Sequence, residues 1–153
     1  MHRLSVRQLL LVALLLLVAM PALADGPFRF YPITPCRLVD TRTGFGGVLT
    51  PNSTRDFQVQ GVCGVPVGAK AAALNVTVFG PTSNGHLRLF PSGATLPTIS
   101  TINFQSGVVI ANGAVVSLST NTNDLSVFTF LGAGGSSSTH LILDVTGYFA
   151  PAP

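Results

Sequence analysis

Short runs of alternating apolar and polar residues, separated by glycine, proline and asparagine, recur along this chain. In residues 74–78 the apolar side chains occupy every second position, and in residues 141–145 Leu141, Leu143 and Val145 share one face in the same way. A period of two is that of a strand with one buried face. Glutamate is absent and lysine occurs once, so residues that usually cover helix surfaces are scarce. The chain is therefore expected to fold from strands.

About ten short strands with turns between them describe a sandwich or a barrel. We expect them at residues 28–33, 37–41, 55–59, 71–79, 86–90, 100–104, 108–110, 114–119, 125–130 and 139–149. Asn112-Gly113, between two apolar runs, is the strongest sign of a tight hairpin. The pattern predicts a single antiparallel β-sandwich, for which a jelly roll is one available topology.

The first 24 residues have the layout of a secretory signal peptide. A basic start precedes an apolar run of 12 residues, and a small-residue cleavage pattern ends at Ala24. The apolar run is shorter than the roughly 20 residues of a membrane-spanning helix. We expect cleavage after Ala24 and a secreted or cell-surface product without a membrane span. It would hold one domain at residues 25–150 and a C-terminal stub at residues 151–153.

Charge is sparse after the expected cleavage point. The whole chain carries a net charge of +3, but the segment from Asp25 onward holds six basic and five acidic side chains. This segment has no basic stripe that a phosphate backbone would follow, so nucleic acid is not expected as a partner. The partners that suit an exported domain of this kind are an extracellular protein or a glycan.

Cys36 and Cys63 are the two cysteines of the chain. In an exported protein two cysteines predict one disulfide, which would stabilise the fold by roughly 3 to 4 kcal/mol for a loop of this length. The alternative is a nucleophilic or metal-binding cysteine. It is disfavoured because no histidine lies near either cysteine in the sequence and because export favours oxidation.

The densest charge lies in residues 35–42, Pro-Cys-Arg-Leu-Val-Asp-Thr-Arg, where Arg37, Asp40 and Arg42 fall within six residues. One interpretation is a binding site for an anion or a carboxylate. The other is a structural cluster, in which Asp40 accepts charge-assisted hydrogen bonds from an arginine and from N–H groups of the following glycine-rich loop. We favour the structural cluster. Asp144, near the end of the chain, either pairs with one of these arginines or faces solvent.

The motifs of this chain, taken in order, resemble a family of secreted bacterial β-modules. Such modules open with P-C-R-L-V-D-T-R and continue with A-x-x-L-N-V-T, G-x-L-x-x-F/Y-P-x-G, P-x-x-S-x-I/L-N-F and an A-N pair. They close with D-V-x-G-Y-F. Here the motifs lie at residues 35–42, 71–77, 85–93, 97–104, 111–112 and 144–149. The resemblance implies an exported β-domain with a structural or adhesive role and no catalytic activity.

Catalytic and metal-binding residues are not indicated. His86 and His140, together with aspartates and serines, are residue types that a hydrolytic triad needs, but no G-x-S-x-G elbow is present. Asn121, Asn123 and Asp124 form a short polar turn that could hold a cation weakly, and a plain turn is the favoured interpretation. The chain lacks a zinc ligand set. We therefore expect no catalytic residue, no cofactor and no metal.

Sugar binding is the main alternative to a structural or interaction role. Sugar sites need exposed aromatic platforms, and this chain has no tryptophan and two tyrosines, Tyr31 and Tyr148. Phe45, in the glycine-rich loop, is the phenylalanine most expected to be exposed. We thus expect a secreted, non-catalytic structural or interaction module. The first alternative is a carbohydrate- or cell-wall-binding module, and the second is a small secreted hydrolase.

Overall fold

The computed structural model describes residues 26–132 and 136–152, so the expected signal peptide lies outside the described residues. The described part is all β. Its strands are β1 (Phe28–Asp40), β2 (Ser53–Phe57), β3 (Ala71–Phe79), β4 (Gly85–Pro91), β5 (Ile102–Phe104), β6 (Ile110–Ser117), β7 (Leu125–Leu131) and β8 (His140–Pro151). No helix long and apolar enough to cross a membrane occurs in these ranges.

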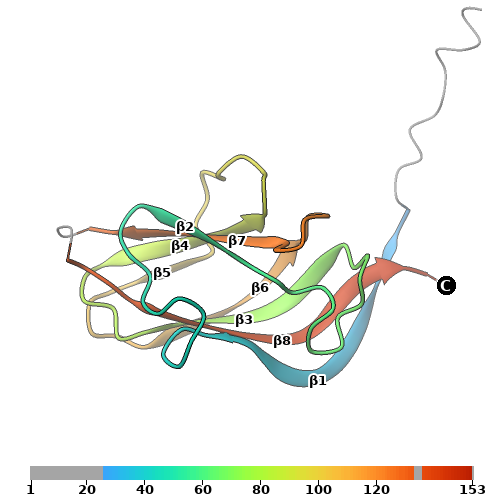
Figure 1. Cartoon of the computed structure of the whole chain (residues 1–153), viewed down its shortest axis with the longest axis horizontal. Coiled ribbons are helices and arrows are strands. Elements are labelled where there is room, and N and C mark those ends of the chain that lie inside the picture. The colour runs from blue at the N-terminus through green and yellow to red at the C-terminus, as the bar shows by residue number, and fades with distance from the viewer. Residues whose placement is uncertain (1–25, 133–135, 153) are drawn as a thin grey trace, which may run out of the picture.

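The strands form two four-stranded antiparallel sheets that face each other, with the orders β1-β8-β3-β6 and β2-β7-β4-β5 (Figure 1). Strand β1 pairs with β8, β2 with β7, β3 with β6 and β4 with β5. The first half of the chain thus pairs with the second half in reverse order, as in a long antiparallel ribbon rolled into two sheets. This is the jelly-roll topology, and the expected β-sandwich is confirmed.

Strand β1 joins two segments that were expected as separate strands, 28–33 and 37–41. Its pairing with β8 shifts register between Pro32 and Cys36 and again between Arg37 and Val39. Such irregularities accommodate a proline, which has no N–H to donate, within an edge strand. The strand bends at these places but does not end, and β1 and β8 therefore stay paired along most of their length.

The expected hairpin at Asn112-Gly113 is wrong. Both residues lie inside β6 and pair with Val76 and Asn75 of β3. A tight hairpin of the Asn-Gly type needs positive φ at both central residues, and neither residue has one. Pairing with β3 overrides the local turn preference. The segments expected at 108–110 and 114–119 accordingly contribute to one strand.

The core lies between the sheets and is made of the inward positions of the alternating runs. The completely buried aliphatic side chains come from both sheets and include Val76, Val78, Leu87, Leu125, Val127, Leu141, Leu143 and Val145. The alternation in residues 74–78 and 141–145 is therefore confirmed as the pattern of two core strands, which pair with each other.

The disulfide between Cys36 and Cys63 is confirmed. It joins β1 to the loop between β2 and β3, with the two Cα atoms 5.8 Å apart. It closes a loop that contains the charged motif, the glycine-rich segment and β2. The edge of the sandwich that β1 and β2 form is thereby tied together covalently.

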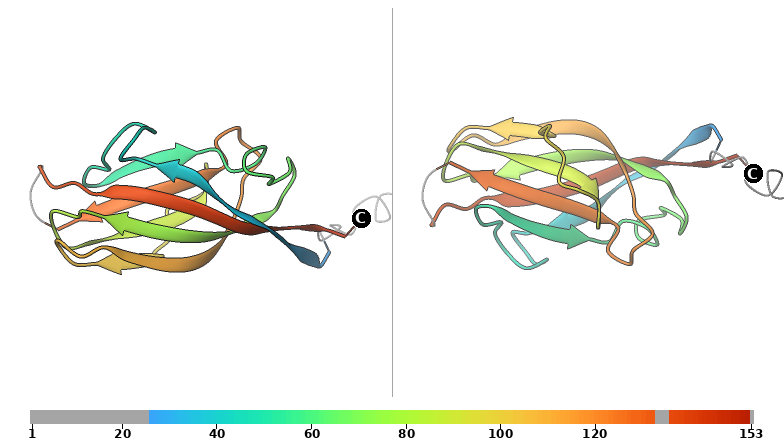
Figure 2. Two further views of the ribbon diagram at one scale, coloured as in Figure 1. Left: turned by 90° about the horizontal axis from the view of Figure 1, so that it is seen from below. Right: turned by 90° about the horizontal axis from the view of Figure 1, so that it is seen from above.

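The start of β1 and the end of β8 project together beyond the body of the sandwich as a two-stranded ribbon (Figure 2). Phe28 pairs with Pro151 at the tip, so β8 runs one residue past the domain boundary expected from sequence. The rings of Tyr31 and Tyr148 stack 5.2 Å apart along the ribbon. The hydroxyl of Tyr31 also donates to the carbonyl of Pro151 at 3.2 Å, which holds this proline in the strand.

Candidate functional site

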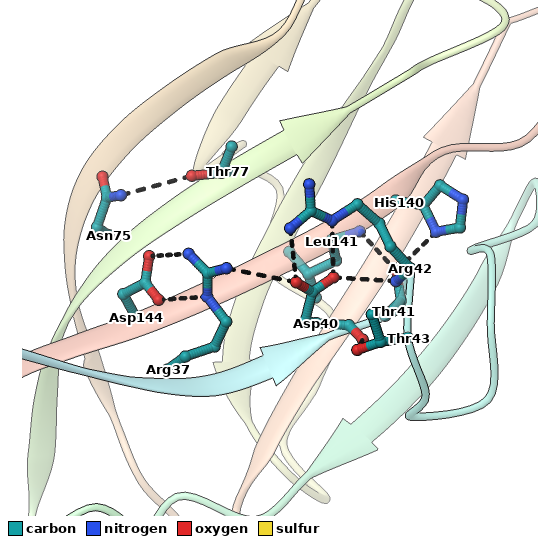
Figure 3. Close-up of polar contacts among 10 residues, drawn as sticks. All are labelled: Arg37, Asp40, Thr41, Arg42, Thr43, Asn75, Thr77, His140, Leu141 and Asp144. Atoms are coloured by element: carbon teal, nitrogen blue, oxygen red, sulfur yellow. Dashed lines mark hydrogen bonds and ion pairs between the residues drawn. The ribbon is translucent and has the colours of Figure 1, made fainter.

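The charged residues singled out in the sequence lie together on the outer face of the β1-β8-β3-β6 sheet (Figure 3). Arg37 of β1 stands opposite Asp144 of β8 in the strand register. Its Nε donates to Asp144 Oδ1 at 2.8 Å and its Nη2 to Oδ2 at 3.3 Å. Of the two positions expected for Asp144, the structure shows the one paired with an arginine.

Asp40 lies at the centre of this cluster. Arg42 places its fork on the carboxylate, with Nε 2.9 Å from Oδ1 and Nη2 2.7 Å from Oδ2, and the backbone N–H of Arg42 adds a bond of 3.1 Å. Arg37 reaches the same carboxylate from the other side at 3.4 Å. This two-point arginine contact is the strong form of a charge-assisted hydrogen bond.

Burial differs among the residues of the cluster, because Asp40 is largely covered whereas Arg37 and Arg42 are exposed. The side chain of Asp40 is 10% exposed, against 49% for Arg37 and 36% for Arg42. The hydrogen bonds from Arg42 hold the pKa of Asp40 well below its ordinary range, although partial burial opposes the shift. The hydrogen bond to Asp144 raises the pKa of Arg37. Asp40 and Arg37 are therefore both ionised at neutral pH.

The residues between and after the charges fix the turn that follows β1. Thr41 N–H donates to the carbonyl of Leu141 at 3.0 Å, and the hydroxyl of Thr41 accepts from the N–H of Leu141 at 2.9 Å. Thr43 N–H and its hydroxyl both approach the carbonyl of Asp40, at 3.2 and 3.3 Å. The motif Asp-Thr-Arg-Thr thus ends the strand and positions the fork of Arg42.

The glycine-rich loop does something different from what was expected. It was expected to donate N–H groups to Asp40, but its carbonyls instead accept hydrogen bonds from Arg55 of β2. The guanidinium of Arg55 binds the carbonyls of Phe45, Gly47 and Val48 at 3.0, 2.7 and 2.9 Å. Positive φ angles at residues 45, 46 and 47 shape the loop around Arg55. This arginine is a loop clamp that sequence reasoning did not identify.

The two histidines considered for a hydrolytic triad occupy separate surroundings. Nε2 of His86 accepts from Nε of Arg88 at 3.1 Å, and its ring stacks on Phe130. Burial lowers the pKa of His86, and the charge of Arg88 lowers it further. His140 Nδ1 lies 3.2 Å from the hydroxyl of Thr41. Within the described residues neither histidine is hydrogen-bonded to a serine and an aspartate together.

Asp124, considered as a weak cation ligand, is a buried cap for a loop. Its carboxylate accepts from the N–H groups of Val59 and Gln60 at 3.0 and 2.8 Å. These bonds satisfy both of its oxygens, and the turn acts as a structural connection. In the described ranges, no group of three or more histidine, cysteine or acidic residues is arranged to hold a metal ion.

A pocket of about 380 Å³ opens between the edge strands β1 and β2, beneath the glycine-rich loop. Its walls include Leu38, Phe45, Phe57, Gln58, Val62 and Asn123. As expected from the sequence, Phe45 is exposed, at 55%. The remaining lining residues were not predicted, because the neighbourhood of β1 and β2 depends on how the two sheets meet.

The outer face of the second sheet carries aromatic residues that sequence reasoning also missed. Phe128 and Phe130 of β7 lie beside Arg88 and His86 of β4 in the register. The guanidinium of Arg88 lies 5.4 Å from the centre of the Phe128 ring. A signal was available in the sequence. In residues 125–131 these phenylalanines occupy the positions between the core residues, and so must point outward.

No protein-family model matches this chain, and no curated protein sequence matches it significantly. Two solved structures of the coat protein of Tobacco streak virus align with it at TM-scores of 0.47 and 0.46 and 12% identity. Both alignments cover 88% of this chain and 92% of the viral chain. This similarity is too low to bear on function.

Proposed function

We propose that this chain is a non-catalytic module that acts outside the cell through structural or adhesive contacts. The observation that supports this best is the mutual neutralisation of the charged cluster, in which two arginines pair with two aspartates. A site for an external anion needs a cation that is not already bound to a carboxylate. The cluster therefore suits a role in holding β1 against β8.

The disulfide supports the extracellular part of the proposal. Bonds of this kind persist in oxidising compartments and are rare in the cytosol. The signal-peptide pattern at the start of the sequence agrees with this compartment. N-terminal sequencing of protein recovered from the medium should begin at Asp25, and an intact Met1 on that protein would count against export by cleavage.

Thermal unfolding of three single variants, Asp40→Asn, Arg37→Ala and Arg42→Ala, tests the structural role of the cluster. Each should lower the unfolding midpoint, and Asp40→Asn should do so most because both arginines lose a partner. Arg29→Ala is the matched control, since Arg29 is an exposed arginine of the same strand and lies outside the cluster. Three variants that melt together with the wild type would refute the structural role.

A hydrolase assay tests the non-catalytic part. The purified protein is offered ester, peptide and glycoside substrates, with His86→Ala and His140→Ala as comparison variants. We expect no turnover above the level of either variant. Turnover that disappears in one of the histidine variants would overturn the proposal.

Carbohydrate binding is the second candidate function, and one observation favours it. Phe45 is an exposed aromatic ring on the wall of a pocket that also has amide side chains. Aromatic rings combined with a few polar groups are typical of small-molecule sites. A glycan array and a pull-down with peptidoglycan would separate this function from a purely structural one.

A further inference from the structure

We propose that the pocket between β1 and β2 binds a neutral sugar that carries an N-acetyl group, with Phe45 as the platform for the sugar ring. This inference rests on the proposed function, because such binding would be one of the contacts through which the module acts. Three features of the pocket support it: an aromatic ring on a clamped loop, an apolar floor and uncharged amide groups at the rim.

The backbone that carries the ring of Phe45 is held in an unusual local structure. Phe45 has a φ of 53°, a left-handed backbone conformation that residues other than glycine and asparagine rarely adopt. The clamp of Arg55 on the carbonyls of the loop fixes this conformation. Gly46 lies against the clamp, since a Cβ there would lie 3.3 Å from the guanidinium of Arg55. The loop therefore presents an exposed ring on a backbone that needs little ordering on binding.

The floor of the pocket is apolar. Leu38 and Phe57 are buried core residues whose side chains reach the pocket, and Val62 closes it from the loop that carries Cys63. The C–H face of a pyranose ring and the methyl of an acetyl group both suit such a surface. A pocket of about 380 Å³ also falls within the range of roughly 300 to 1,000 Å³ that is usual for small-molecule sites.

The rim carries amide groups with hydrogen-bonding capacity to spare. Nε2 of Gln58 donates to the carbonyl of Gln60 at 3.0 Å, so its Oε1 can accept from a ligand. Asn123 lines the pocket with an exposed amide that can donate and accept. Two amides of this kind match the donor and acceptor of an acetamido group and the hydroxyls beside it.

The charges of the pocket wall are already engaged by the protein. Arg55 donates to the loop carbonyls, and the carboxylate of Asp56 accepts from the hydroxyls of Ser126 and Ser92 at 2.6 and 3.3 Å. The two charges in the lining are opposite in sign, so the pocket wall carries no net charge and favours neither an anionic nor a cationic ligand. The ligand that fits is uncharged, which favours an N-acetylated neutral sugar over a uronic acid or an amino sugar with a free amine.

The inference is tested by titrating the protein with two trisaccharides. One is built from N-acetylglucosamine and the other from glucose. We expect the acetylated sugar to bind at least about tenfold more tightly, which corresponds to about 1.4 kcal/mol. Chemical shift changes should centre on residues of the pocket. Equal affinity for the two sugars, or no binding of either, would overturn the inference.

Variants of Phe45 make the test specific to the site. Phe45→Asn removes the ring and keeps a residue that tolerates positive φ, so the fold should remain while binding weakens at least about tenfold. Phe45→Tyr should keep binding. The matched control is Phe130→Ala, which removes an exposed ring from the outer face of the β2-β7-β4-β5 sheet. Wild-type affinity in folded Phe45→Asn would overturn the inference.

The outcomes also separate this inference from the proposed function. A folded protein that binds neither sugar overturns only the assignment of the pocket. Hydrolysis of either trisaccharide that disappears in His86→Ala overturns the non-catalytic function itself. Selective loss of binding to the acetylated sugar in Gln58→Ala or Asn123→Ala would support the role given to the amides. An unchanged preference for the acetylated sugar in both variants would count against that role.

Discussion

The two edges of the sandwich differ in charge and in what covers them. At the edge formed by β1 and β2, residues 37–56 hold five charged side chains, whereas residues 89–123, which include β5 and β6, hold none. The first edge has register irregularities, a disulfide and a clamped loop. At the second edge, formed by β5 and β6, Val115 is 63% exposed.

Edge strands leave backbone groups free to pair with other chains, and proteins protect them with bulges, prolines and charges. The β1 edge has all three. The β6 edge has none of these protections and is closed toward the other sheet by a bond from Nδ2 of Asn112 to the carbonyl of Thr101 at 2.8 Å. The comparison shows that one fold can stabilise one edge strongly and leave the other lightly covered.

Removal of the disulfide should have the largest effect. Replacing Cys36 and Cys63 by alanine should lower the free energy of unfolding by roughly 3 to 4 kcal/mol, because the unfolded chain regains the entropy of a loop spanning 27 residues. Urea unfolding measures this. The wild type unfolded under reducing conditions is the control and should match the double variant. A loss below about 1 kcal/mol would show that the first edge does not depend on its covalent tie.

Asp40→Asn should have the second largest effect on stability, and acid should reproduce this effect in the wild type. The pKa of Asp40 is lowered in the folded state by Arg42, so the carboxylate stabilises the fold above its unfolded pKa of about 3.9. This stabilisation is lost as the pH falls through and below that value. Unfolding midpoints measured from pH 6 to pH 2 should therefore drop less steeply in Asp40→Asn than in the wild type. Parallel curves would contradict the assignment.

Asn112→Ala should have a smaller effect, confined to the second edge. It removes the bond to Thr101, and one neutral hydrogen bond contributes about 0.5 to 1.5 kcal/mol. Asn103→Ala is a control on the neighbouring strand β5, where the residue is exposed. Hydrogen exchange should quicken around residues 99–116 in Asn112→Ala. Faster exchange around β1 instead would mean that the two edges are coupled.

Val115→Lys should have the smallest effect on stability and a visible effect on association. A surface change of this kind usually alters the free energy of unfolding by no more than about 0.5 kcal/mol. A charge on the bare edge opposes strand pairing between copies. Light scattering during heating should therefore rise later than in the wild type. Thr54→Lys, on the exposed face of β2, is the control and should leave scattering unchanged.

The sequence predicted the parts of the fold that depend on local pattern. Alternation in residues 74–78 and 141–145 was enough to place two core strands, and two cysteines in a chain expected to be exported were enough to predict their bond. The partners of Arg37 could not be read in the same way. Asp144 is 107 residues away, and the register that brings it opposite Arg37 depends on the irregularities in β1.

The same limit explains the errors. Asn112-Gly113 has the local chemistry of a turn, but pairing with β3 decides its conformation. Arg55 was not recognised as the clamp of the glycine-rich loop because its contacts are made by a side chain to backbone carbonyls. Such contacts leave no pattern in the sequence. The pocket under Phe45 was missed because it lies where the two sheets meet.

The pairing of Phe28 with Pro151 has a mechanical consequence. A pull on these two residues loads the β1–β8 ladder from its tip, and antiparallel hydrogen bonds perpendicular to the strands then open one after another. When the opening reaches Cys36, the disulfide passes the tension directly to Cys63. Residues 37–62 then carry no tension. The charged cluster loses Asp144 as β8 is drawn away, but the loop of Phe45 and its clamp stay outside the path of the force.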